Sequence, residues 1–270
     1  MVVQAVRSLV FYALFIGQTV VLAIIVAVIA LIDRRRTGTG LAVGRYWGHI
    51  NIFLLRWVVG IRTRVDGGEN VPEGPCIIAA KHQSDWDIFA ILPFARRPAF
   101  IAKKQLMDIP VFGHAARSVD TITIDRSLGA QAIPRMLEDG RRAVERGCQI
   151  IIFPEGTRRA PLDPPDYRQG ILRMYEALGV PVVPVALNSG LFWGRNSLIL
   201  WPGTARARFL APIPPGLDAA TFKARLVEAV ETGSNRLIAE AVDRGVARPV
   251  PPEWRARLAA LGFPTVRDGD

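Results

Sequence analysis

A run of 25 residues without a charged side chain, Ser8 to Ile32, constrains this chain more than any other feature. It is too long for the apolar core of a cleaved signal, which is about 7–15 residues, and long enough to cross a membrane. Arg7 precedes the run, and arginines at 34–36 follow it. Because positive charge collects on the cytoplasmic side, we expect the rest of the chain at the cytoplasmic face of the cell (inner) membrane.

A second apolar segment, Gly40 to Ile61, is interrupted by polar residues such as Arg45. Its tryptophans, Trp47 and Trp57, suit a helix that lies in the membrane interface. An ordinary buried helix fits the same pattern. We expect residues 1–62 to form a membrane anchor of two helices, and the pattern leaves open whether the first helix spans the membrane or enters one leaflet.

The charge balance bears on partners. The chain carries a net charge of +10 and has a positive mean hydropathy of +0.23. A basic and apolar chain favours an anionic membrane surface over nucleic acid as its partner, although an arginine-rich composition alone gives the same charge. Cys76 and Cys148 lie inside apolar runs, and the three histidines are scattered. We therefore expect no disulfide framework, no metal site and no cofactor.

Beyond residue 62, short apolar runs alternate with helical patterns, which is typical of an α/β fold. Most of the runs are continuously apolar, as in strands that are covered on both faces. The expected strands are 76–80, 99–102, 121–125, 148–153, 182–187 and 205–210. The last run alternates arginine with alanine, so we expect it at a sheet edge. The sequence predicts a central, mostly parallel sheet flanked by helices over residues 63–216.

Helical spacing of apolar residues appears in three places after the third expected strand. One helix is expected over about 133–144 with Gly147 as its stop, and another between Gly170 and Gly179. A charged helix begins after Asp218, a suitable N-cap, and continues to about Val242. A tail rich in proline and arginine follows. Residues 217–270 are predicted to form a C-terminal helical extension and tail.

The motif KHQSDWD separates two apolar runs and contains the candidate catalytic pair. His82 and Asp87 would point about 140° apart on a continuous helix. We therefore expect a strand to end near Ala80, a turn to carry His82, and a helix to begin with Ser84 or Asp85 as its N-cap. The carboxylate can then hold one imidazole N–H and leave the other nitrogen free to accept a proton. A polar cap with a hydrogen-bonded histidine is the alternative reading.

Two later segments place charged residues after expected strands. ITIDRS puts Arg126 directly after one strand, and FPEGTRR puts Glu155 and Arg158 after another. Gly156 allows the second loop to approach a ligand closely, and α/β sheets place their sites at this end of their strands. The order H-x4-D, I-D-R, F-P-E-G-T-R and V-P-V resembles the glycerolipid acyltransferase family, and within it the lysophosphatidic acid acyltransferases. The resemblance covers residues 71–211.

The resemblance implies a reaction and roles for individual residues. His82 would be the general base, oriented by Asp87, and would remove the proton of an acceptor hydroxyl that attacks the thioester of acyl-CoA or acyl-carrier protein. The acceptor would be a lysophospholipid, acylated at its sn-2 hydroxyl to give phosphatidic acid. The resemblance assigns the acceptor's phosphate and the surrounding pocket to Lys103, Arg126, Glu155, Gly156, Thr157 and Arg158.

The sequence departs from the family pattern at three places that bear on the acceptor. Arg159 stands where the family often has serine, Arg168 replaces a lysine, and Asp85 adds an acid to the first motif. Other acceptors, such as lyso-ornithine lipid or glycerol 3-phosphate, therefore stay open. Two further functions remain: a thioesterase that uses the same pair with water, which the arginine cluster disfavours, and a membrane-binding module without catalysis.

Overall fold

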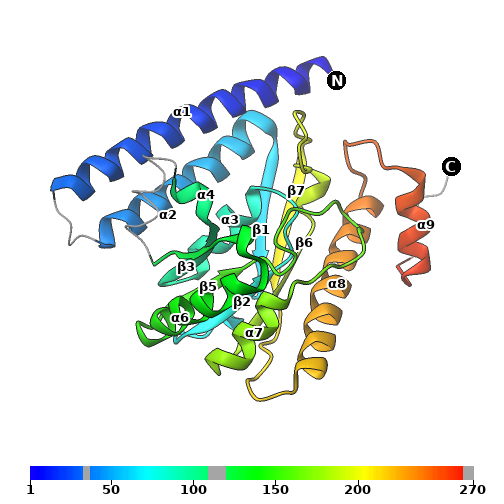
Figure 1. Cartoon of the computed structure of the whole chain (residues 1–270). Helices are drawn as coiled ribbons and strands as arrows, with labels where there is room; N and C mark the ends of the chain where they lie inside the picture. The colour runs from blue at the N-terminus through cyan, green and yellow to red at the C-terminus, as the bar shows by residue number, and fades with distance from the viewer. Residues whose placement is uncertain (33–36, 109–119, 264–270) are drawn as a thin grey trace.

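The computed structural model describes residues 1–32, 37–108 and 120–263. Within these residues a seven-stranded sheet with the order β1-β7-β6-β2-β5-β3-β4 lies at the centre of the molecule, with helices around it (Figure 1). The strands are β1 (Ile61–Asp66), β2 (Cys76–Ala80), β3 (Pro98–Lys103), β4 (Ile122–Ile124), β5 (Gln149–Ile152), β6 (Val182–Leu187) and β7 (Gly203–Phe209). Strand β7 runs antiparallel to β6, and the other neighbouring strands are parallel. The predicted α/β fold with a mostly parallel sheet is confirmed.

The three helices predicted from apolar spacing after the third expected strand are present as α6 (Ala132–Glu145), α7 (Gln169–Leu178) and α8 (Ala219–Asp243). The other helices are α1 (Val2–Ile32), α2 (Thr37–Leu54), α3 (Trp86–Ile91), α4 (Lys104–Met107) and α9 (Pro252–Ala260). Asp218 caps α8 by accepting a hydrogen bond from the backbone N–H of Thr221. Gly179 ends α7 in the left-handed conformation, as expected of a glycine after a helix. Helix α9 lies within the predicted C-terminal extension and tail.

The central strands are buried on both faces, which explains their continuous apolar sequences. Alternate residues of β2 enter two different clusters: Ile78 packs with α3 on one face, and Ile77 packs with α6 and α7 on the other. Helix α8 contributes to both clusters, through Phe222 on one face and Ile238 on the other. The C-terminal helix is therefore packed into the core that supports the sheet.

Strand β7 is not at an edge, so that prediction is wrong. Its alternation has another cause: Arg206 is 5% exposed and forms ion pairs with Asp66 on β1 and Glu240 on α8. Strand β1 lies at that edge; the sequence analysis did not predict this strand and placed its first residue, Ile61, at the end of the second apolar segment. The helix ends before that residue because a π-helical turn and Gly60, with φ of 92°, follow α2 and lead directly into β1.

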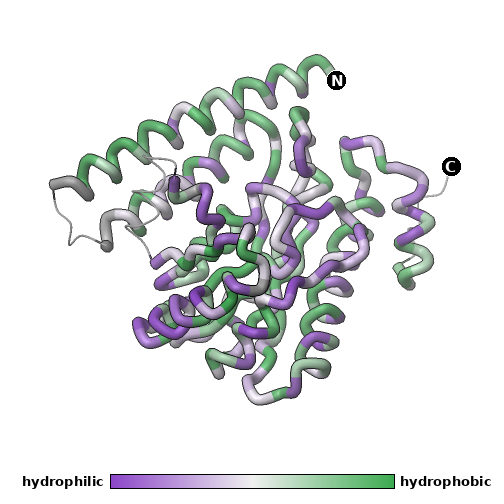
Figure 2. Tube along the Cα trace, in the orientation of Figure 1, coloured by the Kyte–Doolittle hydropathy of each residue, from purple (hydrophilic) through white to green (hydrophobic). Residues whose placement is uncertain are grey.

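The two N-terminal helices lie side by side along one side of the core (Figure 1). In the described part of the chain only α1 is long and apolar enough, over Val2–Ile29, to cross a membrane. Helix α2 is interrupted by polar residues and does not meet that test. Figure 2 shows that α1 is hydrophobic along most of its length. The arginines at 34–36 lie outside the described residues, as does His114.

Polar side chains of α1 face the core together with the fully buried Phe11, whereas a helix on the surface of a soluble protein turns its polar side to solvent. Gln4 Nε2 donates to the carbonyl of Leu200 at 2.6 Å, and Tyr12 donates from its hydroxyl to Ser197 O at 2.7 Å. The opposite side carries exposed apolar side chains such as Leu9, which is 70% exposed. The outward face of α1 is therefore suited to an apolar environment.

Candidate active site

The first motif folds as a strand, a turn and a short helix, as its sequence predicted. Strand β2 ends at Ala80 and α3 begins at Trp86, so the turn between them carries His82. His82 Nδ1 lies 2.9 Å from Asp87 Oδ2. An ionised carboxylate only accepts hydrogen bonds, so this contact places the imidazole proton on Nδ1 and leaves the Nε2 lone pair free. The structure thus brings together the two residues of the predicted pair.

The Asp87 carboxylate is fully buried and held by several donors. Besides the imidazole, Oδ2 accepts from the backbone N–H groups of Gln83 and Ser84, at 2.7 and 2.9 Å. Oδ1 accepts from the hydroxyls of Ser84 at 3.2 Å and Ser189 at 2.5 Å. Ser189 follows β6 and lies 102 residues from Asp87 in sequence. The sequence analysis missed Ser189, because no motif marks a contact over that separation.

The predicted N-cap position of the short helix is confirmed at Asp85, but its side chain makes no capping hydrogen bond there. Ser84 is fully buried, and its hydroxyl donates to Asp87. The backbone N–H groups of the turn are satisfied by Asp87 instead, which ties the shape of the turn to the carboxylate that orients the histidine.

The loop after β5 packs directly against the histidine. The rings of His82 and Phe153 are stacked with their centroids 4.0 Å apart. The backbone N–H of Arg159 donates to the carbonyl of His82 at 2.8 Å. The His82 side chain remains 16% exposed. The FPEGTRR loop therefore fixes the ring from one side while part of the imidazole stays accessible to solvent.

The same loop brings Arg158 to the first motif. Gly156 has φ of 69°, which allows the turn that follows β5, and Thr157 next to it is partly buried. Arg158 Nη1 lies 2.8 Å from Asp85 Oδ2. Burial raises the pKa of Asp85 above its usual range, and the positive charge of Arg158 offsets part of this rise. The predicted phosphate ligand thus meets a carboxylate of the chain itself.

Glu155, which was predicted to shape the pocket, lies in a buried ion network. Its Oε1 lies 3.1 Å from Lys81 Nζ, and both side chains are almost fully buried. Lys81 also pairs with Glu231 of α8 at 2.8 Å, and the hydroxyl of Tyr167 donates to the same Glu231 at 3.0 Å. Burial raises the pKa of Glu155, while Lys81 acts in the opposite direction. This network connects α8 to the residue next to His82, and the sequence analysis missed both Lys81 and Glu231.

The remaining predicted residues lie at the carboxyl ends of neighbouring strands. Strands β2, β5, β3 and β4 are parallel neighbours in that order, so their carboxyl ends lie on the same side of the sheet. Lys103 ends β3 and is exposed, and in the described residues no hydrogen bond or ion pair joins it to His82 or Asp87. Arg126 follows Asp125, the first residue after β4. The Arg126 side chain lies outside the described part of the structure.

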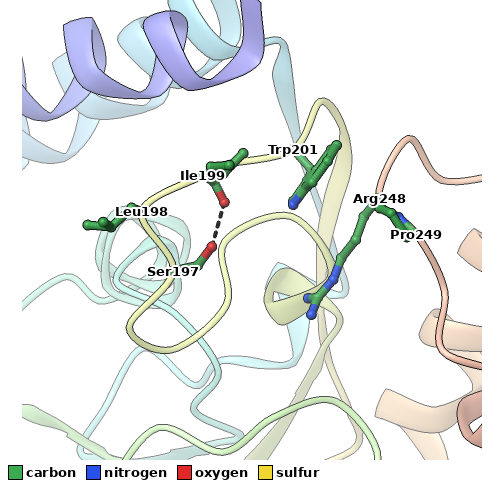
Figure 3. Close-up of a pocket in the computed structure, with 6 residues that line it drawn as sticks. All are labelled: Ser197, Leu198, Ile199, Trp201, Arg248 and Pro249. Atoms are coloured by element: carbon green, nitrogen blue, oxygen red, sulfur yellow. Dashed lines mark hydrogen bonds between the residues drawn. The ribbon is translucent and has the colours of Figure 1, made fainter. Parts of the chain in front are cut away.

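A surface pocket of about 500 Å³ lies apart from these residues (Figure 3). None of the predicted site residues lines it; its lining is Ser197, Leu198, Ile199, Trp201, Arg248 and Pro249. Arg248 extends from the C-terminal segment toward the connection between β6 and β7, and its Nη1 donates to Gly190 O at 2.9 Å. Gly190 adjoins Ser189, so the wall of this pocket supports the loop that holds Asp87.

Together, the fold and the site define an α/β enzyme in which a buried aspartate orients a histidine next to an arginine. The Acyltransferase family model matches residues 62–188. A 1-acyl-sn-glycerol-3-phosphate acyltransferase from Pseudomonas aeruginosa is 35% identical over 202 residues, which are 75% of this chain and 78% of that protein. A protein of the same name from Cocos nucifera is 30% identical over 172 residues, covering 63% of this chain and 56% of that protein.

A solved structure shows the same fold. The crystal structure of the 1-acyl-sn-glycerophosphate (LPA) acyltransferase PlsC from Thermotoga maritima matches with a TM-score of 0.72 and 24% identity, over 92% of this chain and all of that one. The chain belongs to this acyltransferase family and is an acyltransferase. The match to the family model ends at residue 188, so Ser189 and Glu231 lie outside it.

Proposed function

We propose that the protein transfers an acyl chain from acyl-CoA or acyl-carrier protein to the sn-2 hydroxyl of lysophosphatidic acid and so forms phosphatidic acid. The names of its relatives support this reaction. The observation that carries the proposal is the placement of the His82–Asp87 pair beside the loop of Arg158. A base then lies next to a phosphate ligand, as an acceptor with a hydroxyl near its phosphate requires.

The mechanism follows from the free nitrogen of the histidine. His82 Nε2 accepts the proton of the acceptor hydroxyl while the oxygen attacks the thioester carbonyl. The bond between the carbonyl carbon and sulfur breaks, and the imidazolium gives its proton to the leaving thiolate. Asp87 stabilises the imidazolium and holds the ring in place. The acyl donor is a substrate, and the proposed mechanism uses neither a cofactor nor a metal ion.

The acceptor's phosphate is assigned to the basic residues along the sheet edge. A guanidinium offers parallel N–H groups that match phosphate oxygens, which favours Arg158 and Arg126 as ligands. Lys103 supplies a further positive charge for the phosphate or for the oxyanion that develops on the thioester carbonyl. Glu155 stabilises the loop through its buried ion pair with Lys81. Gly156 and Thr157 set the path of the loop.

A membrane location agrees with where α1 lies. Tyr12 of α1 is within electrostatic reach of both Asp85 and Arg158, so the helix passes close to the site. We propose that the outward face of α1 rests in the cytoplasmic leaflet of the inner membrane. Because Gln4 and Tyr12 stay bonded to the core, this part of α1 would lie along the membrane. A lysolipid then reaches the site without its chain entering water, where each exposed CH₂ costs about 0.8 kcal/mol.

The release of thiol from an acyl-CoA by the detergent-purified protein tests the proposal, with lysophosphatidic acid present or absent. We expect release that requires the acceptor, yields phosphatidic acid and is lost in His82→Ala. Release without any acceptor would indicate a thioesterase. Release that requires lyso-ornithine lipid or another lysolipid instead would change the acceptor but keep the base. No release from either acyl-CoA or acyl-carrier protein would leave only membrane binding.

A further inference from the structure

In the sequence, Asp85 lies between His82 and Asp87. In the described residues it forms no hydrogen bond with either of them. Its carboxylate turns away from the helix that it precedes and pairs with Arg158 of the loop after β5. The proposed function assigns the acceptor's phosphate to Arg158. An anion of the chain therefore occupies the position at which the anion of the substrate is expected.

The exposure of this pair makes it exchangeable. The side chain of Asp85 is 37% exposed and that of Arg158 is 29% exposed, whereas Lys81 and Glu155 are almost completely buried. Ion pairs in contact with solvent contribute about 0.2–1 kcal/mol. A phosphate group carries up to two negative charges and can accept two N–H groups of one guanidinium. It can therefore displace a single carboxylate that holds Arg158 through one nitrogen.

Partial desolvation also makes Asp85 a weak competitor, although its side chain reaches solvent. Its pKa is raised because the surroundings disfavour the charged form, and Arg158 is the largest influence that opposes this rise. When a phosphate takes over Arg158, the Asp85 carboxyl can turn toward solvent or take up a proton, so it does not have to keep that arginine. The contact between Asp85 and Arg158 is thus strong enough to neutralise the arginine in the empty site and weak enough for the acceptor's phosphate to displace it.

We propose that Asp85 is a specificity-determining counter-ion: it neutralises Arg158 in the empty site and must be displaced by the acceptor's phosphate. This inference rests on the proposed function, through the role of Arg158. Its consequence is that Asp85 weakens the binding of phosphorylated acceptors and leaves the proton transfer at His82 unaffected. The residue would set the acceptor concentration over which the enzyme responds.

The test compares the kinetics of wild type and Asp85→Asn with lysophosphatidic acid as the varied substrate. We expect KM for lysophosphatidic acid to fall by about 1.5- to 5-fold, which corresponds to the range for exposed ion pairs, with kcat within twofold of wild type. The inhibition constant of inorganic phosphate should fall by the same factor. In an Arg158→Gln background, Asp85→Asn should no longer lower KM.

A matched control lies on α7. Glu176 pairs with Arg173 at 3.3 Å, and these side chains are 41% and 58% exposed. Glu176→Gln removes the same charge from another exposed ion pair, and we expect it to leave KM unchanged. An equal fall of KM in Glu176→Gln would show that the general charge of the surface acts, and would overturn the role of Asp85.

The inference is also overturned if KM in Asp85→Asn stays the same or rises, because a rise means that Asp85 orients Arg158 for binding. Thermal-shift titrations of both proteins with inorganic phosphate separate this inference from the proposed function, since they require no turnover. If wild type shows no release dependent on lysophosphatidic acid, the proposed function fails. Tighter phosphate binding by Asp85→Asn would then still support the counter-ion, and unchanged binding would overturn it as well.

Discussion

Two aspartates of one motif, Asp87 and Asp85, have opposite environments. Asp87 is fully buried and receives hydrogen bonds from the turn, from the histidine and from Ser189. Asp85 is 37% exposed and is held by Arg158 of a neighbouring loop. The first carboxylate has its position fixed on several sides, and the second can exchange its partner.

This difference separates the chemistry of the site from its binding of the acceptor. A general base must be held in its reactive orientation before the substrate arrives, since reorganisation during the reaction raises the barrier. A phosphate ligand must instead be free to leave one partner for another. The proposed function assigns the first condition to His82 and Asp87, and the second to Arg158 and Asp85.

The largest expected effect comes from substitutions in the His82–Asp87 pair. Replacing His82 by alanine, or Asp87 by asparagine, should lower kcat by about 10²–10⁴-fold, which is the contribution of a positioned general base. KM for the acceptor should change little, because neither side chain is assigned to the phosphate. Steady-state kinetics of acyl transfer measure both parameters. Full activity in either variant would mean that another group removes the proton.

The next effect tests the buried ion network of Lys81, Glu155 and Glu231. Glu231→Ala leaves Lys81 buried with Glu155 alone, and breaking a buried ion pair costs about 3–5 kcal/mol. We expect the midpoint of thermal unfolding to fall by about 6–20 °C, from the usual relation for domains of this size. Glu228, which is exposed on the same helix, provides the control: Glu228→Ala should leave the midpoint unchanged. Equal midpoints for the two variants would contradict a stabilising network.

A smaller effect concerns the serine that holds Asp87. Ser189→Ala removes one donor to a buried carboxylate, and a hydrogen bond to a charged group contributes about 1.5 kcal/mol or more. We expect kcat to fall about tenfold with KM unchanged, and Ser189→Thr to restore most of the rate because it keeps the hydroxyl. Ser197→Ala, on the same connection between β6 and β7, should retain wild-type kcat. A Ser189→Thr variant as slow as alanine would indicate a packing role instead.

The smallest effect is a dependence of stability on pH that comes from Asp85. The pKa of Asp85 is raised in the folded protein, so the folded state holds this proton to higher pH than the unfolded chain does. Stability from this group is therefore greatest at acidic pH and declines as the pH rises through the raised pKa. Asp85→Asn removes the decline, and we expect it to be as stable as wild type or slightly more stable at pH 7, by less than about 1 kcal/mol.

Unfolding curves of wild type and Asp85→Asn between pH 4 and about 7 measure this difference. The advantage of the variant over wild type should grow as the pH rises. A variant that becomes less stable than wild type toward neutral pH would show that the charged carboxylate of Asp85 stabilises the fold.

Much of the fold follows from local sequence patterns. The runs at 76–80 and 182–187 became β2 and β6 with the same bounds, because continuous apolar residues between turn signals leave few alternatives. Strand β1 was missed because its charged residues directly follow an apolar helix. Strand β7 was misplaced because its alternation reflects ion pairs of Arg206 with two other elements. Partners far away in the sequence decide such cases.

The site divides in the same way. The pairing of His82 with Asp87 depends on five residues of local geometry, and the sequence predicted it. The contacts of Asp87 with Ser189 and of Lys81 with Glu231 join residues 102 and 150 positions apart. Neither contact belongs to a motif, and only the pairing of β6 with β2 and the packing of α8 against β6 create them. The pairing of Asp85 with Arg158 likewise required the loop after β5 to lie against the first motif.

The most direct test of this division is a side-by-side measurement of kcat and KM for Asp87→Asn and Asp85→Asn, with lysophosphatidic acid as the varied acceptor. We predict that Asp87→Asn lowers kcat by at least about 10²-fold with KM nearly unchanged. Asp85→Asn should lower KM with kcat nearly unchanged. If both variants change the same parameter in the same direction, the two aspartates act as one unit and the separation of chemistry from acceptor binding is wrong.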